Sequence, residues 1–273
     1  MLFTRSDGTK CTDVAPTRSI MPFIMPTRTE SAVYFEQWID LTKTNAFLET
    51  WNAANPERKA TVFHVFLWAA VYSLDQRPRL NRFVMGSRIW QRSGIWLSYA
   101  AKKRLEDGAP LVVLKRRFDP THSFTELVDF VSGDVKVGRS GEKSAVDKEL
   151  NVFLRIPAPL LRLGVGLVRW LDSWNLLPAS FIDNDPLYTS MFVANLGSVR
   201  LDSAYHHLYE YGNCPFFAAL GRTQTVVTPE GPRSMCSVKY SFDERIEDGL
   251  YCAKGLELLK ARMEDPAAAG KVS

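Results

Sequence analysis

The chain has 273 residues, of which 46% are hydrophobic, and its 34 basic and 30 acidic residues give a formal net charge of +4. This composition is sufficient for one large core and too apolar for a disordered chain, so we expect a single domain. The mixed charge lacks the strong basic excess of nucleic-acid-binding proteins, which argues against a nucleic-acid partner.

The cysteines and the N-terminal segment indicate the expected compartment. The four cysteines show neither a C-x-x-C pair nor the spacing of a zinc site, so we expect free thiols and no metal. Residues 1–20 lack the apolar core of a signal peptide, and no later run is long and apolar enough to cross a membrane. Together these features predict a cytoplasmic protein.

The predicted domain covers residues 21–265, between a flexible N-terminal tail at 1–20 and a flexible C-terminal tail at 266–273. Hydrophobic periods of strands and helices alternate along it. The expected elements of the first half are a strand and a helix at 31–51, a buried helix at 61–81, hairpins at 83–91 and 95–118, and a helix opened by the capping box at 123–126.

Residues 150–182 are predicted to form an apolar helical insertion. Within it, Arg162 and Arg169 lie seven residues apart on one face of a helical run, and almost all the other side chains from Leu160 to Leu171 are apolar. An additional core helix with two arginines reaching solvent explains this pattern. A helix that docks on a membrane surface or on a protein partner through residues 157–177 explains it as well.

The C-terminal part of the chain contains the most informative pattern. Residues 234–242 alternate as a strand, a charged turn follows from Asp243 to Gly249, and residues 250–264 form an amphipathic helix. Upstream, residues 188–197 and 215–222 predict two more strands, the first ending Ala-Asn-Leu-Gly and the second ending Gly-Arg.

This layout resembles the chloramphenicol acetyltransferase-like superfamily, in particular the catalytic domain of 2-oxo acid dehydrogenase dihydrolipoamide acyltransferases. In that family the turn carries His-x-x-x-Asp-Gly, and the upstream strand ends Ser-Asn-Leu-Gly. Here Asp248 and Gly249 match, Glu244 stands at the His position, and Ala194 replaces the Ser before Asn195. The resemblance implies an α/β fold, a two-layer sandwich with a mixed β-sheet, assembled as a homotrimer or a higher assembly with sites between subunits.

The resemblance also implies a chemistry that both replacements weaken. In the family, the His removes the thiol proton of coenzyme A or dihydrolipoamide, and the Ser stabilises the oxyanion. A carboxyl of pKa about 4.3 at Glu244 facing a thiol of pKa about 8.5 makes proton transfer uphill by about 6 kcal/mol. Ala194 cannot donate a hydrogen bond, and a lost oxyanion donor costs on the order of 3 kcal/mol. We therefore expect a catalytically degenerate protein that acts as an assembly or binding module and needs no cofactor.

A coenzyme A dependent acyltransferase is the alternative. Its base would be Glu244, or His206 or His207, which form the one histidine pair of the chain. The coenzyme A would bind near the family strand at Ala194 and Asn195. No lipoyl group is expected, because the chain shows no lipoyl domain. A hydrogen-bonded aromatic loop without catalytic role explains the histidine pair more simply.

Two further expectations concern the charged turn. In the family, the Asp at the position of Asp248 is held by an arginine, for which Arg28 and Arg245 are candidates. If Glu244 is buried, it needs a cationic partner, because an unpaired buried carboxylate is costly. Arg245 or the histidine pair would supply that partner.

Overall fold

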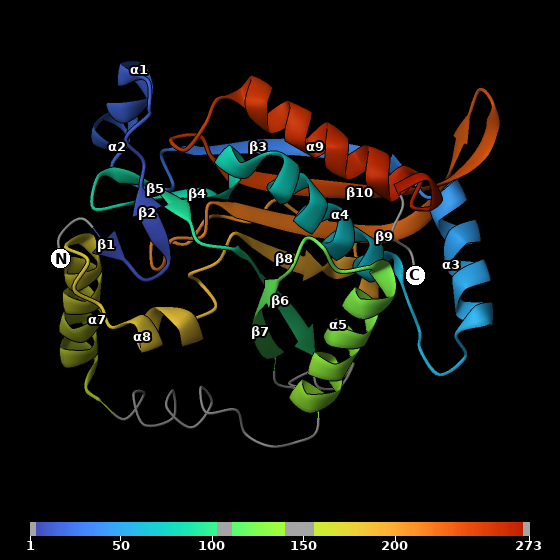
Figure 1. Ribbon diagram of the computed structural model, residues 1–273, viewed down its shortest axis with the longest axis horizontal. Helices are drawn as coiled ribbons and strands as arrows, with labels where there is room; N and C mark the ends of the chain where they lie inside the picture. The colour runs from blue at the N-terminus through green and yellow to red at the C-terminus, as the bar shows by residue number, and fades with distance from the viewer. Residues whose placement is uncertain (1–3, 103–110, 140–155, 270–273) are drawn as a thin grey trace.

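The computed structural model describes residues 4–102, 111–139 and 156–269. Its framework is a six-stranded mixed sheet in the order β3-β10-β9-β8-β6-β7 (Figure 1). Strand β8 is parallel to both of its neighbours, and the other adjacent pairs are antiparallel. The six strands are β3 (Ala32–Asp40), β6 (Ile95–Lys102), β7 (Leu111–Phe118), β8 (Met191–Asn195), β9 (Phe216–Thr228) and β10 (Gly231–Asp243).

Four helices pack against one face of this sheet, with α4 and α9 lying across it in Figure 1. They are α3 (Thr42–Ala54), α4 (Val62–Gln76), α5 (Phe124–Arg139) and α9 (Gly249–Glu264). Alternate side chains of β10, including Val238, Tyr240 and Phe242, are buried in the core between the two layers because strand side chains alternate between faces. The predicted two-layer α/β arrangement with a mixed sheet is confirmed.

Helix α4 is the buried helix that its apolar sequence predicts. A capping box closes its N-terminus: the Thr61 side chain binds the backbone N–H of His64, and His64 Nδ1 accepts the backbone N–H of Thr61 at 3.1 Å. The helix ends at Gln76 because the residue before Pro78 disfavours the helical conformation. A 3₁₀ turn follows at Pro78–Asn81.

A second sheet, in the order β1-β2-β5-β4, contains part of the segment expected as a flexible tail. Residues 4–10 form a small hairpin whose turn carries a buried ion pair, with Arg5 Nε 2.8 Å from Asp7 Oδ1. Asp7 also accepts a hydrogen bond from Asn213 Nδ2 at 2.7 Å. The elements are β1 (Thr4–Arg5), β2 (Gly8–Lys10), β4 (Arg82–Met85) and β5 (Arg88–Arg92), and short helices α1 (Pro16–Ser19) and α2 (Met21–Ile24) follow β2.

Both predicted hairpins are present, but they belong to different sheets. Strands β4 and β5 meet at a tight turn in which Gly86 and Ser87 have positive φ, and β6 pairs with β7 in the main sheet. At the other end of the chain, the expected tail begins with a buried Pro266 and a 3₁₀ turn at Ala267–Ala269. The last four residues lie outside the described part.

The sheet face opposite the helices is crossed by residues 200–214. Leu208 packs there with Phe192, Cys214 and Phe217 in a small second core. Ser203 and Ser237 share a hydrogen bond at 2.6 Å, which ties the same segment to β10.

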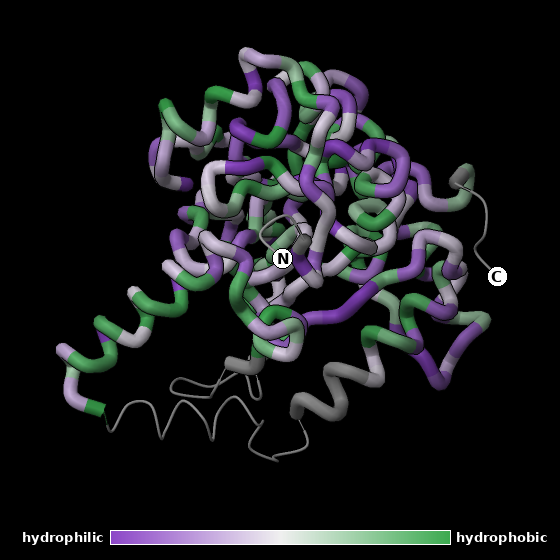
Figure 2. Tube along the Cα trace, turned by 60° about the vertical axis from the view of Figure 1, so that its left-hand side comes forward, coloured by the Kyte–Doolittle hydropathy of each residue, from purple (hydrophilic) through white to green (hydrophobic). Residues whose placement is uncertain are grey.

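The apolar insertion forms α7 (Ala158–Ser173) and α8 (Ala179–Asn184); its first residues, 150–155, lie outside the described part. The interpretation of α7 as a core helix is wrong, because most of its side chains are exposed and Leu163 keeps 70% of its surface accessible. Figure 2 shows this helix extending away from the body of the domain. None of the described helices combines the length and apolar character needed to cross a bilayer.

Candidate functional site

The turn between β10 and α9 is organised around a buried ion pair. Arg245 Nη2 lies 2.7 Å from Asp243 Oδ2, and Arg245 Nε lies 2.8 Å from Asp243 Oδ1. Ser31 Oγ donates to the same carboxylate at 3.0 Å, and Arg245 Nη1 donates to the carbonyl of Met25 at 3.0 Å. The turn is therefore fixed to the segment that precedes β3.

Glu244, which the sequence resemblance aligns with the family His, lies between the two partners of this ion pair. Its backbone N–H donates to the carbonyl of Ser31 at 3.0 Å, and its carbonyl accepts a hydrogen bond from Arg18. Its side chain is half-buried, and within residues 4–102, 111–139 and 156–269 the carboxylate has no hydrogen-bond or ion-pair partner. The expected partner Arg245 binds Asp243 instead: the chain turns after Asp243, with the backbone N–H of Ile246 bound to the Asp243 carbonyl, and the Arg245 guanidinium lies against the Asp243 carboxylate.

Asp248 caps α9 and is exposed. Its Oδ1 accepts the backbone N–H of Tyr251 at 2.8 Å, and this hydrogen bond lowers the pKa of the carboxyl. Among the described residues no arginine binds it, so the expected bracing by Arg28 or Arg245 is not found. An arginine instead binds Glu247, which is buried and has its Oε2 3.2 Å from Arg79 Nη1.

Arg28 is buried beside the turn, and burial lowers its pKa. Its Nη1 donates to the carbonyls of Tyr209 and Glu210, both at 3.0 Å, and its Nη2 donates to the carbonyl of Val84 at 3.2 Å. The Glu210 carboxylate accepts the backbone N–H groups of Arg28 and Thr29. The arginine therefore joins three segments that are far apart in the sequence.

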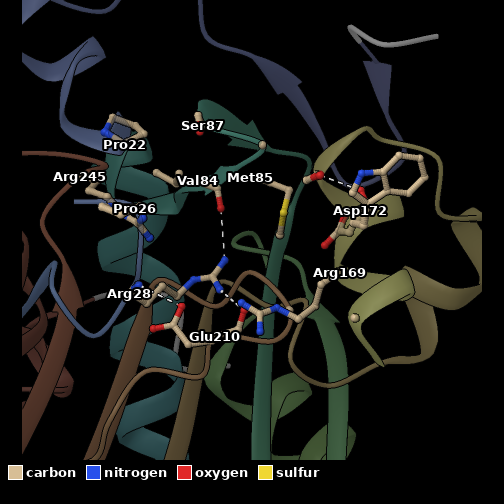
Figure 3. Close-up of a pocket in the computed structure, with 15 residues that line it drawn as sticks. Pro22, Pro26, Arg28, Val84, Met85, Ser87, Arg169, Asp172, Glu210 and Arg245 are labelled. Carbon is tan, nitrogen blue, oxygen red and sulfur yellow. Dashed lines mark hydrogen bonds between the residues drawn. The ribbon is translucent and has the colours of Figure 1, made fainter. Parts of the chain in front are cut away.

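A cavity of about 440 Å³ opens at this point, next to the turn. Arg28, Glu210 and Arg245 form one wall, and Arg169 of α7 approaches from the other side (Figure 3). Arg28 and Arg245 are already bound to carbonyls or to Asp243, so the protein itself satisfies most of the charge in this wall. The two carboxylates that line the cavity are also engaged: Asp172 binds Arg5 and Tyr188, and Glu210 accepts the backbone N–H groups of Arg28 and Thr29.

The histidine pair lies on the helix-free face of the sheet, away from Glu244. The His206 ring stacks on Phe217, with centroids 3.8 Å apart and planes at 5°, and it also stacks on His207. Ser241 Oγ donates to the carbonyl of His206. Because Ser241 precedes Glu244 by three residues, the histidine pair lies roughly 10 Å from Glu244 along the chain direction of β10. Burial lowers the pKa of His206, so the imidazole is held neutral.

Ala194 is half-buried on β8, packed against the second core, and Asn195 Oδ1 accepts the backbone N–H of Ser198. In register, Ala194 pairs with Ala219, which pairs in turn with Lys239 of β10. Glu244 lies five residues after Lys239, just past the end of β10. Ala194 and Glu244 are therefore roughly 15–20 Å apart within one chain.

The cysteines provide no reactive thiolate. All four are free, and burial raises the pKa of Cys214 and Cys236 to about 11 and that of Cys252 to about 12. Burial also raises the pKa of Cys11. Within the described residues, no cluster of histidine, cysteine and acidic side chains could hold a metal ion.

Comparison with solved structures decides the fold. A probable dihydrolipoamide acetyltransferase from Listeria monocytogenes superposes with a TM-score of 0.59 at 18% identity, over 94% of this chain and 95% of that chain. The cubic core of the pyruvate dehydrogenase multienzyme complex gives 0.62 at 16% identity, over 92% and 87%. A chloramphenicol acetyltransferase gives 0.55 at 9% identity, over 93% and 95%. The chain has the chloramphenicol acetyltransferase-like fold. No protein-family model matches the sequence, and neither does any curated protein.

Within this chloramphenicol acetyltransferase-like fold, sequence reasoning located the turn but missed the residues that hold it. Asp243 and Ser31 stand at the ends of strands, where an acidic or hydroxyl residue gives no signal of burial. Ser31 and Arg245 both bind Asp243, and the Ser31 contact depends on the pairing of β3 with β10. The sequence contains no signal that favours Asp243 over Glu244 as the partner of Arg245.

Proposed function

We propose that this chain is a catalytically degenerate acyltransferase-like protein that acts as an assembly or binding module and forms a homotrimer. The observation that carries the proposal is that the Glu244 carboxylate is unpaired among the described residues. Its neighbours on both sides bind each other, its carboxylate has no described partner, and a carboxylate is a poor base for a thiol. Ala194, at the position that the resemblance aligns with the family Ser, has no side-chain hydrogen-bond donor.

The distance between these two positions supports assembly. Because Ala194 and Glu244 are roughly 15–20 Å apart in one chain, a single site could contain both only if it were built from two subunits. Exposed aromatic side chains on the helix-free face are suited to such a contact, since Tyr and Trp are enriched in interfaces. Tyr34, Trp38 and Tyr205 each keep more than 40% of their surface accessible.

A specific observation favours His206 as the base if the protein is an active acyltransferase with coenzyme A. His206 Nδ1 lies 2.7 Å from the carbonyl oxygen of His207. A carbonyl only accepts, so Nδ1 carries the hydrogen and Nε2 keeps the lone pair that a general base needs. The lowered pKa of His206 keeps that lone pair available at neutral pH.

Light scattering tests the assembly. We expect about three times the chain mass of 30.9 kDa at micromolar concentration, or a multiple of that mass for a higher assembly. Replacing Trp38 by Glu should lower the mass, whereas the same change at Val227, an exposed residue of the distant β9–β10 hairpin, should leave it unchanged. A monomeric wild-type protein would contradict the proposed trimer.

An acetyl-transfer assay tests the loss of catalysis. With acetyl coenzyme A and dihydrolipoamide or chloramphenicol, we expect no more than the background rate. Turnover that disappears in His206→Gln but persists in Glu244→Gln would establish the alternative with His206 as base. Turnover lost only in Glu244→Gln would assign the base to Glu244. The double variant Glu244→His, Ala194→Ser tests whether an imidazole and a hydroxyl at these two positions restore activity.

A further inference from the structure

Among the described residues, the contacts that fix helix α7 to the domain lie at its C-terminal end. Asp172 is buried there, and its two oxygens bind Arg5 Nη1 at 2.6 Å and Tyr188 Oη at 2.9 Å. The β4–β5 turn packs so closely that a Cβ on Gly86 would lie 2.2 Å from the carbonyl oxygen of Ser173. The buried end sets the direction of the helix, and the preceding turns extend outward (Figure 2).

The extended part of α7 has one broad apolar face and one narrow basic face. An exposed stripe runs along the apolar face at spacings of three and four residues, which places its members on one side of a helix. It consists of Leu160, Leu163, Leu167, Trp170 and Trp174, each at least 45% accessible. Arg162 and Arg169, seven residues apart and both exposed, share another side of the helix, about 120° around its axis from the stripe. From residue 156 to residue 171 the sequence contains no acidic side chain.

A second exposed apolar element lies beside α7. Ile20, Phe23 and Ile24 on the short α1–α2 segment are 47%, 65% and 64% accessible. This segment and α7 stand at the same end of the molecule in Figure 1, and both line the 440 Å³ cavity, through Pro22 and Trp170 respectively. Both elements therefore present exposed apolar side chains at the end of the molecule where the cavity opens.

We propose that this end of the protein binds the surface of an anionic lipid bilayer, with α7 lying in the interface. Charge complementarity supports this occupant, because the only charges on the extended part of the helix are two arginines that can reach lipid phosphates. Tryptophan at positions 170 and 174 suits the boundary between headgroups and acyl chains. The helix lies on the bilayer and does not cross it.

Vesicle co-sedimentation of the full chain tests this binding. We expect binding to phosphatidylcholine vesicles that contain phosphatidylserine, weaker binding to pure phosphatidylcholine, and loss of binding as salt is raised. Leu163→Glu should abolish binding, whereas the matched control Val227→Glu, an 84% accessible residue at the opposite end of the molecule, should bind like wild type. Arg162→Gln with Arg169→Gln should weaken binding by about fivefold per arginine. Because the extended turns of α7 contact little else, none of these changes should alter the melting temperature.

Any of four results would overturn the proposal. The first two are wild-type protein that stays in the supernatant with all vesicles and Leu163→Glu that sediments with them as wild type does. Equal binding to charged and uncharged vesicles would contradict the anionic surface. A fall in assembled mass of Leu163→Glu by light scattering, without vesicle binding by wild type, would assign the stripe to contacts between copies of the chain.

Discussion

Asp243 and Arg245 bind each other across Glu244, with Arg245 Nη2 2.7 Å from Asp243 Oδ2 and both side chains at most 3% accessible. The ion pair and the hydrogen bond from Ser31 fix the turn without using the side chain of Glu244. The shape of the turn thus does not depend on which side chain stands at its centre. This independence allows the central position to change while the fold persists.

The first prediction follows from this independence. Asp243→Asn leaves Arg245 buried without its counter-charge, and removing one partner of a buried pair costs about 3–5 kcal/mol. The melting temperature should fall by about 10 °C, whereas Glu244→Gln should change stability by less than about 0.5 kcal/mol. Thermal unfolding followed by circular dichroism measures both. The opposite ranking of the two variants would show that Glu244 is the anchor of the turn.

The second prediction concerns the contact between the β4–β5 turn and α7. Gly86 has a φ of 59°, and an added Cβ would meet the carbonyl oxygen of Ser173. Gly86→Ala therefore combines backbone strain with a clash and should destabilise the protein by roughly 2–4 kcal/mol. Gly231→Ala gives strain without a clash: its φ of 113° is more strained for an L residue than that of Gly86, but no atom lies within 4 Å of its Cβ position. A loss in Gly86→Ala of no more than about 1 kcal/mol by chemical denaturation, the cost of a left-handed residue alone, would remove the role of the close approach.

The third prediction concerns pH. Burial lowers the pKa of His64 from 6.5 to about 4, so the folded protein resists protonation of this side chain while the unfolded chain accepts it. Stability should therefore fall as pH decreases from about 6.5 towards 4, by about 2 kcal/mol at pH 5 from this group alone. Above about pH 6.5, protonation of His64 no longer changes the stability of the fold.

His64→Gln provides the control for that pH dependence. Glutamine at this helix position can accept the backbone N–H of Thr61 in the usual capping box, but it does not titrate. Denaturant unfolding at pH 7 and pH 5 should give a smaller difference for the variant than for wild type. An identical pH dependence in both proteins would mean that His64 does not contribute.

The fourth prediction concerns the attachment of α7. Asp172→Ala removes the buried contacts with Arg5 and Tyr188 and should cost about 3 kcal/mol, with faster amide hydrogen exchange in residues 158–171. Asp183 of α8 is exposed, so Asp183→Ala should cost less than about 0.5 kcal/mol and leave the exchange of α7 unchanged. Unchanged exchange of α7 in Asp172→Ala would show that other contacts hold the helix.

The sequence by itself determined the layered α/β fold, the buried helix α4 with its ends, both hairpins and the turn before α9. The layered fold is what the family resemblance implies, and the other features depend on local signals: hydrophobic period, turn glycines, capping residues and the proline that stops a helix. The resemblance alone singled out Glu244 and Ala194.

Tertiary structure alone decided which charges are paired and which apolar faces stay exposed. The pairing of Arg5 with Asp172 joins residues 167 apart in the chain, and it turns an expected N-terminal tail into a strand. Helix α7 reads as a core helix in sequence because an apolar face looks the same whether the protein or another surface covers it. Burial of a side chain depends on the elements packed around it, and local sequence does not contain that information.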